Sequence, residues 1–182
     1  MTGDSSAAGS SAYVGCLTAD GRERWLESFG PGNIDNRSGG STAAVAGDYA
    51  ALVNFTIDQH CGGGSYTVEV YELRTGSRIP DRGGETVSGP VLSGCSSYID
   101  HVVVGSGGVS AAQTIFGRGC PPVTSTQCPT EQIVASDSTG VHTLDTCTGS
   151  DLEEPSALTG LSLSGDMLTW LHVGSPRSAV LH

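Results

Sequence analysis

The sequence predicts an all-β protein built from antiparallel four-stranded units. Short segments rich in Val, Ile, Tyr and Thr alternate with Gly, Asp and Asn, which are typical of tight turns. Long segments with apolar residues at helical spacing are nearly absent. Pairs of strand-like segments recur at a near-constant distance along the chain, which indicates a structural repeat.

The composition limits the classes of partner. The chain has 182 residues, of which 37% are hydrophobic, enough for one domain with a core. Its net charge is −11 and its eight basic residues are all Arg, so we expect no nucleic-acid partner. Its apolar runs are far shorter than the roughly 20 residues of a spanning helix, so we expect no membrane insertion.

The predicted elements follow one another in a regular order. Residues 1–12 (MTGDSSAAGSSA) are predicted to form a flexible Gly/Ser linker, and residues 13–182 a repeat domain. Within that domain we expect a hairpin, two four-stranded units and a final hairpin, at 13–28, 41–81, 98–147 and 157–181. The predicted turns have glycine beside a strand, at Gly47, Gly76, Gly107, Gly140 and Gly165.

The spacing of these turns defines the repeat. Gly47, Gly107 and Gly165 are roughly 60 residues apart, and a second hairpin lies between each pair. One repeat is therefore two hairpins, or four strands. Four-stranded antiparallel units in series are the blades of a β-propeller. The chain is expected to begin and end halfway through such a unit.

Particular segments resemble a known family. DYAALVNF followed by VEVYELRTGSRI is similar to the repeats of bacterial WD-like and PQQ-like β-propeller proteins. The segment LTGLSLSGDMLTWLHVGSPRSAVL resembles the closing segment of secreted actinobacterial proteins of that kind. The resemblance covers residues 12–181 and implies the C-terminal portion of a propeller. Because propellers have about four to eight blades, two units and two halves imply a partial or three-bladed one.

The expected function follows from this architecture. We expect an extracellular or cell-envelope binding or scaffolding module, with a protein or carbohydrate ligand held by loops at the ends of the blades. Open blade edges would allow self-association. One alternative is a hydrolase or lyase that acts on a polysaccharide or peptide in the central channel. Another is a C-terminal fragment of a larger propeller protein.

The glycine cluster at 105–108 (GSGG) imitates a dinucleotide-binding loop. That chemistry requires a helix beginning at the glycines, so that its N-terminus meets the pyrophosphate. The following residues lead into GRGCPPVTSTQCP at 117–129, where such a helix would not continue. The cluster is therefore predicted to be a hairpin turn, and no cofactor is expected.

Catalytic residues are not assigned by any motif. No G-x-S-x-G elbow is present, and GDSS at 3–6 lies in the predicted linker. The enzyme alternative requires carboxylates and histidines to converge in one concave pocket. The candidates are Asp35, Asp100, Asp137, Asp145, His60, His101, His142, His172 and His182.

The six cysteines lack the spacing of a zinc site. An even number without a CxxC pair fits disulfides in an oxidising compartment, and six buried thiols are the alternative. Cys120 and Cys128 bracket a Pro-containing loop and are the candidate disulfide pair. Oxygen-rich segments at 32–40 and 150–155 are candidate Ca²⁺ ligands, but they match no EF-hand and are interpreted as solvated loops.

Trp25 and Trp170 are the largest apolar side chains, and each lies in a predicted strand near a tight turn. Packing in the core or between blades is the expected role. The alternative is a platform that stacks on a ligand.

Overall fold

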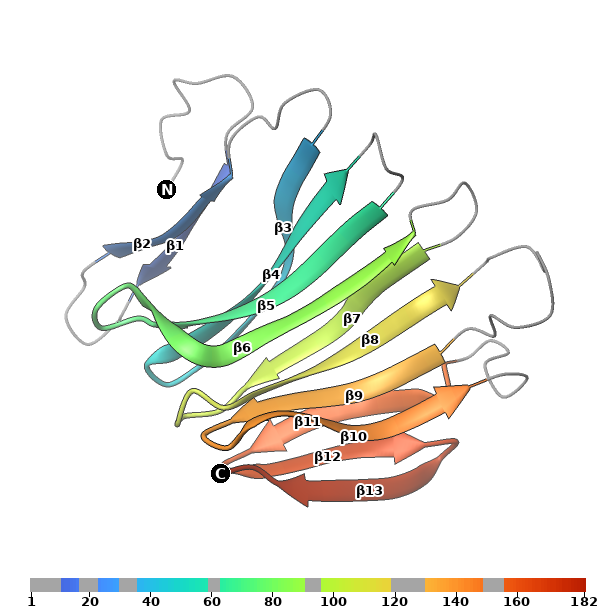
Figure 1. Cartoon of the computed structure of the whole chain (residues 1–182). Coiled ribbons are helices and arrows are strands. Elements are labelled where there is room, and N and C mark those ends of the chain that lie inside the picture. The colour runs from blue at the N-terminus through green and yellow to red at the C-terminus, as the bar shows by residue number, and fades with distance from the viewer. Residues whose placement is uncertain are drawn as a thin grey trace.

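The computed structural model describes residues 11–16, 23–29, 36–58, 63–90, 96–118, 130–148 and 156–182. These residues form β-strands and turns and contain no helix, so the all-β prediction is confirmed for them (Figure 1). They accordingly include no helix of a length and apolarity that could span a membrane.

Thirteen strands are described, and each pairs in antiparallel fashion with its neighbour along the chain. They are β1 (Ser11–Cys16), β2 (Glu23–Phe29), β3 (Asn36–Ala46), β4 (Tyr49–Asp58), β5 (Gly63–Glu72), β6 (Ser77–Pro90), β7 (Ser96–Val104), β8 (Ser110–Arg118), β9 (Thr130–Asp137), β10 (Gly140–Thr148), β11 (Leu158–Ser164), β12 (Met167–His172) and β13 (Ser175–Val180).

The strands form a hairpin and three sheets. β1 and β2 pair only with each other, and β2 contacts β3. We call β3–β6 the first sheet, β7–β10 the second sheet and β11–β13 the third sheet, each with its strands in sequence order. The third sheet has three strands, one more than the final hairpin expected from the sequence. The sheets are not closed into a ring (Figure 1).

The second sheet lies between the other two and is covered on both faces. One face packs on the first sheet through a cluster that includes Val53, Val70 and Val102. The other packs on the third sheet through a cluster that includes Ile133 and Leu168. Because both faces are covered, residues 110–115 of β8 are all buried and lack the alternation of a half-exposed strand.

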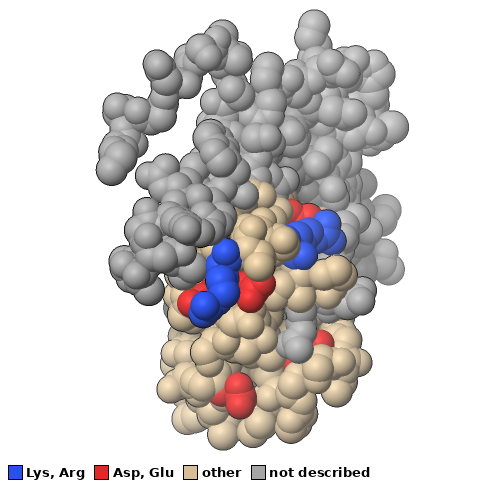
Figure 2. Space-filling model, turned by 90° about the vertical axis from the view of Figure 1, so that its left-hand side faces the viewer, with Lys and Arg blue, Asp and Glu red and all other residues tan. Residues whose placement is uncertain are grey.

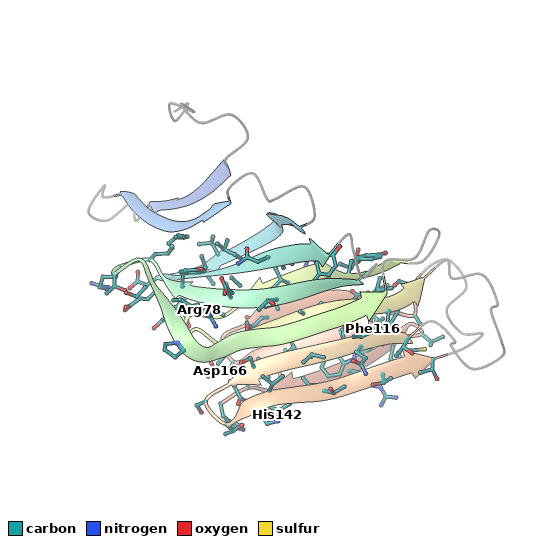
Figure 3. All side chains as sticks on the ribbon, turned by 45° about the horizontal axis from the view of Figure 1, so that its top comes forward. Arg78, Phe116, His142 and Asp166 are labelled. Carbon is teal, nitrogen blue, oxygen red and sulfur yellow. The ribbon has the colours of Figure 1, made fainter. Side chains whose placement is uncertain are left out.

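The turns predicted at glycine lie at one end of the sheets (Figure 1). Gly47, Gly76, Gly140 and Gly165 have positive φ, which a side chain would oppose. In the turn between β7 and β8 the positive φ of 77° belongs to Gly108, whereas the sequence pointed to its neighbour Gly107. Figure 3 places Arg78, His142 and Asp166 toward this turn end and Phe116 toward the opposite end.

The glycine cluster at 105–108 brings neighbouring sheets together. A Cβ atom on Gly108 would lie 3.1 Å from the Tyr49 ring and 3.2 Å from Ile79 Cδ1, both on the first sheet. A Cβ atom on Gly105 would lie 3.1 Å from Leu163 Cδ2 and 3.2 Å from the carbonyl oxygen of Gly165, both on the third sheet. The cluster is followed by strand β8 and not by a helix, so the prediction of a hairpin turn is confirmed.

A bulge interrupts the first strand of each sheet. The register shifts between Gly40 and Thr42 in β3, between Ile99 and His101 in β7, and between Thr159 and Ser162 in β11. Bulges bend a strand and redirect the side chains next to the extra residue. The bulges in β7 and β11 lie at the candidate site, which is formed between the second and third sheets.

Charged side chains on the first sheet are paired. Arg74 NH2 lies 2.6 Å from Asp48 Oδ2, and Arg78 NH1 lies 2.8 Å from Glu69 Oε1. Glu69 also accepts hydrogen bonds from Asn54 Nδ2 and the Tyr71 hydroxyl. Figure 2, which views the turn end of the molecule, shows these basic and acidic atoms side by side.

Candidate functional site

The seam between the second and third sheets joins buried carboxylates and an amide of one sheet to the other sheet and the residues flanking it. Its apolar part joins the two sheets through residues such as Ile133, Leu158 and Leu168, each fully buried. Three carboxylates of the second sheet, Glu131, Asp137 and Asp145, accept hydrogen bonds from the third sheet or from the residues flanking it. Buried polar groups of this kind require such partners, because burial without them is costly.

Asp145 is the centre of the first polar cluster. It accepts a 2.6 Å hydrogen bond from Trp170 Nε1, and His172 Nδ1 lies 2.9 Å from both of its carboxylate oxygens. Trp170 and His172 are two residues apart on β12 and therefore share one face of the sheet. Burial raises the pKa of Asp145, but the hydrogen bonds from Trp170 and His172 outweigh it, so the pKa lies below its usual value.

Glu131 and Gln113 hold the beginning of β11 by bonding to the two backbone groups of Leu158. A Glu131 oxygen accepts a 2.9 Å hydrogen bond from the Leu158 amide, and Gln113 Nε2 donates a 2.7 Å bond to the Leu158 carbonyl. The Ser156 hydroxyl donates to Glu131 and lies 3.3 Å from Gln113 Nε2. The side chains of Glu131 and Gln113 are almost fully buried, so their bonds to Leu158 fix β11 against the second sheet.

Asp137 anchors the last residue of the chain to the β9–β10 turn. It accepts hydrogen bonds from the Thr139 amide and hydroxyl, and a 2.9 Å bond from the His182 amide. His142 Nε2 lies 3.3 Å from the same carboxylate. Burial raises the pKa of Asp137, yet the hydrogen bonds from Thr139, His182 and His142 together hold it far below its usual value.

A polar hollow of about 220 Å³ opens at the side of the seam formed by β7 and β11. The lining residues are Asp100, His101, Gln113, Ser156, Leu158, Thr159, Gly160 and Leu161. Asp100 and His101 are neighbours on β7, and on a regular strand they would point to opposite faces. The bulge between Ile99 and His101 lets both line the same hollow.

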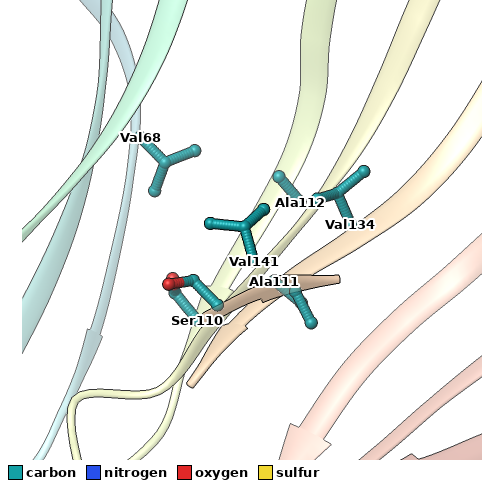
Figure 4. A pocket seen from close by; sticks show the side chains of 8 residues that line it. Val68, Ser110, Ala111, Ala112, Val134 and Val141 are labelled. Atoms are coloured by element: carbon teal, nitrogen blue, oxygen red, sulfur yellow. The ribbon is translucent and has the colours of Figure 1, made fainter. Parts of the chain in front are cut away.

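Two further hollows lie elsewhere among the described residues. A space of about 410 Å³ lies on the third sheet and is lined by residues of β12 and β13 with Gly160. A small apolar space between strands of the first and second sheets is lined by Val68, Val134 and Val141 among others (Figure 4). Its volume of about 10 Å³ is that of a single water molecule, so it is a packing gap.

The structure separates the candidates that an enzyme would bring together. Asp100 and His101 line the polar hollow, Asp137 lies beside His142 and the His182 backbone, and Asp145 bonds to His172. Asp35 and His60 lie outside the described residues. Within the described ranges no group of three His, Cys, Asp or Glu side chains is arranged to hold a metal ion.

Other sequence predictions fall partly outside the described ranges. Cys120, Cys128, the GDSS segment and the oxygen-rich segment 150–155 all lie there, and of 32–40 only residues 36–40 are described, as part of β3. No disulfide is seen among the described residues, in which Cys147 is buried in the core between the second and third sheets. Trp170 is 5% exposed and bonded to Asp145, which agrees with core packing.

Gln113, Glu131 and Ser156 were not predicted from the sequence. A signal was present, because Gln113 and Glu131 interrupt strands whose other residues are mostly small or apolar. Their partners lie 25 or more residues away along the chain, so only the packing of two sheets shows what they bind.

Comparison with protein-family models, with curated proteins and with solved structures finds no match to this chain.

Proposed function

We propose that the chain is an extracytoplasmic binding or scaffolding module of the β-propeller type. Two four-stranded antiparallel sheets and a three-stranded one, each connected in sequence order, support the architecture. The even number of cysteines, without the spacing of a zinc site, supports a place outside the cytoplasm. Open sheet edges, such as that of β13, support self-association.

One observation carries the binding role: the carboxylates of the seam are used as structural acceptors. Glu131 and Asp145 are committed to donors on the facing sheet, and Asp137 to the chain end. A hydrolase needs a carboxylate or imidazole that faces the substrate and a pocket where these groups meet. Among the described residues the three Asp–His pairs lie at three different places, which favours binding over catalysis.

The polar hollow also bears on the hydrolase alternative, because Asp, His and Ser side chains line it together. The Ser156 hydroxyl, however, donates a hydrogen bond to Glu131, and that buried carboxylate also accepts one from the Leu158 amide, so both groups are held in place by the seam. A serine nucleophile instead needs a base that accepts its proton near the substrate. The hollow is therefore better suited to holding a ligand than to cleaving one.

Binding is tested by a panel of defined ligands. The purified chain, produced under oxidising conditions, is titrated with neutral and charged oligosaccharides and with unstructured peptides, and binding is followed by calorimetry. We expect saturable binding to one class without turnover. Product formation from any member, followed by chromatography, would favour the hydrolase or lyase alternative.

The extracytoplasmic location is tested by intact mass with and without reductant. We expect the mass to rise on reduction, by two hydrogens for each disulfide opened. Six reactive thiols in protein made under oxidising conditions would remove the argument from the cysteines.

A further inference from the structure

We propose that the polar hollow between β7 and β11 binds a neutral, hydroxyl-rich ligand, one sugar residue of a glycan. This inference rests on the proposed binding function and names its site and ligand class. It is carried by the chemistry of the lining and by the two bulges at the hollow.

The lining offers both donors and acceptors and no positive side chain of Lys or Arg. Asp100 supplies a carboxylate, His101 an imidazole and Thr159 a hydroxyl, while the Gln113 amide nitrogen and the Ser156 hydroxyl of the lining already have partners in the seam. A sugar hydroxyl both donates and accepts hydrogen bonds, so a mixed set of this kind suits it. Carboxylate and amide groups are also planar and can engage two adjacent hydroxyls at once.

An anion and a metal ion each fit this hollow poorly. An anion would face the Asp100 carboxylate in a chain of net charge −11, with no Arg in the lining. A metal ion needs several oxygen or nitrogen ligands, and no such group of three occurs among the described His, Cys, Asp and Glu side chains. A neutral polar ligand suits the mixed donors and acceptors of the lining, and glucosamine in the test below represents the organic cation that Asp100 would also attract.

The floor of the hollow is rigid and partly apolar. Gln113 is 4% exposed, and its amide nitrogen is fixed by the Leu158 carbonyl, so its orientation is set before any ligand arrives. Leu161, which is 6% exposed, adds a small apolar surface against which a C–H group of a sugar ring can pack, whereas Leu158 is fully buried. A volume of about 220 Å³ is below the roughly 300–1,000 Å³ of sites for drug-sized ligands, which suits one ring.

Two bulges face each other across the hollow. The bulge in β7 aims Asp100 and His101 into it, and the bulge in β11 places Thr159 and Gly160 on the opposite side. Bulges next to a site commonly redirect side chains toward it. Gly160 has a φ of 66°, a conformation that a residue with a side chain rarely adopts.

The test compares hollow variants with a matched surface variant. The probes are cellobiose, maltose, N-acetylchitobiose and galactobiose, with glucuronic acid as the anionic and glucosamine as the cationic comparison. Binding is measured by calorimetry and by saturation-transfer NMR. Asp100→Asn and His101→Ala alter exposed residues of the hollow, and Asp166→Asn makes the same charge change at an exposed turn. Unchanged melting temperatures show that the variants are folded.

We expect one neutral disaccharide to bind, and each hollow variant to lose about tenfold in affinity while Asp166→Asn keeps it. Sugar binding that survives both hollow variants would overturn the inference and leave the binding function standing. Binding to peptides alone, or preference for the anionic sugar, would do the same. Failure of every probe would count against the inference and the proposed function together.

Discussion

Gly108 lets a turn of the second sheet approach the first sheet more closely than a side chain allows. Its φ of 77° disfavours any residue with a Cβ, and that Cβ would meet Tyr49 and Ile79 at 3.1–3.2 Å. Two separate costs, backbone strain and crowding, therefore fall on one position.

A series of three glycine-to-alanine variants separates these costs. Gly107 has neither positive φ nor a neighbour within 4 Å, Gly174 has a φ of 77° in open space, and Gly108 combines both features. We expect Gly107→Ala to be near neutral. Gly174→Ala should lose about 1–2 kcal/mol of the free energy of unfolding, and Gly108→Ala should lose more. Denaturant midpoints measure the difference, and equal losses at Gly107 and Gly108 would contradict this account.

Turn glycines can be predicted from local sequence because turn chemistry is local. Which of two adjacent glycines takes the positive φ cannot be predicted in this way. Gly107 and Gly108 are the same residue type, and they differ only in their tertiary surroundings. The same limit applies to Trp170: core packing was expected from its type and strand, whereas its bond to Asp145 depends on how two sheets meet.

Strand β11 is held at Leu158 by side chains of the neighbouring sheet, in addition to its pairing with β12. Removing Glu131 would leave a buried amide without its acceptor, which costs about 1–3 kcal/mol. The effect should be concentrated in this strand, because the other strands keep their own partners.

Hydrogen exchange tests this anchor. We expect Glu131→Ala to accelerate amide exchange in Leu158–Ser164 while β4 and β5 of the first sheet stay protected. Glu131→Gln keeps an oxygen acceptor and should lie between this variant and the native chain. Equal protection of β11 in the native chain and in Glu131→Ala would show that the side chain does not hold the strand.

At the level of elements, the sequence predicted the antiparallel hairpins but not the bulges. Alternation and turn residues are visible in one dimension, so four-stranded units could be inferred. The bulge at Asp100 leaves no such mark, because the run IDHVVV contains no glycine or proline. For this reason the joint position of Asp100 and His101 in one hollow could not be foreseen.

The stability of the whole stack should depend on pH in acid. Asp137 and Asp145 each connect the second sheet to the third sheet or the chain end, and both have pKa values below the usual one. A lowered folded-state pKa gives stability that is fully present above the unfolded value of about 3.9. That stability is lost as pH falls toward the folded value.

We expect the denaturant midpoint of the native chain to fall steeply below about pH 4. The double variant Asp137→Asn, Asp145→Asn should be less stable at neutral pH and show a flatter dependence in acid. Asp166→Asn, an exposed change of equal charge, should keep the native slope. A double variant as acid-sensitive as the native chain would locate the dependence elsewhere.

Gly105 lies where the turn of the second sheet meets the third sheet, so its lack of a side chain affects how the two sheets pack. The hydrogen atoms of Gly105 face Leu163 and the Gly165 carbonyl across the same boundary that opens, farther along β7, into the polar hollow. Any bulkier residue there would act as a wedge and tilt the two sheets against each other. Because such a side chain would also meet Val109 Cγ2 at 2.9 Å in its own turn, a substitution at Gly105 is expected to disturb both this turn and the spacing of the two sheets.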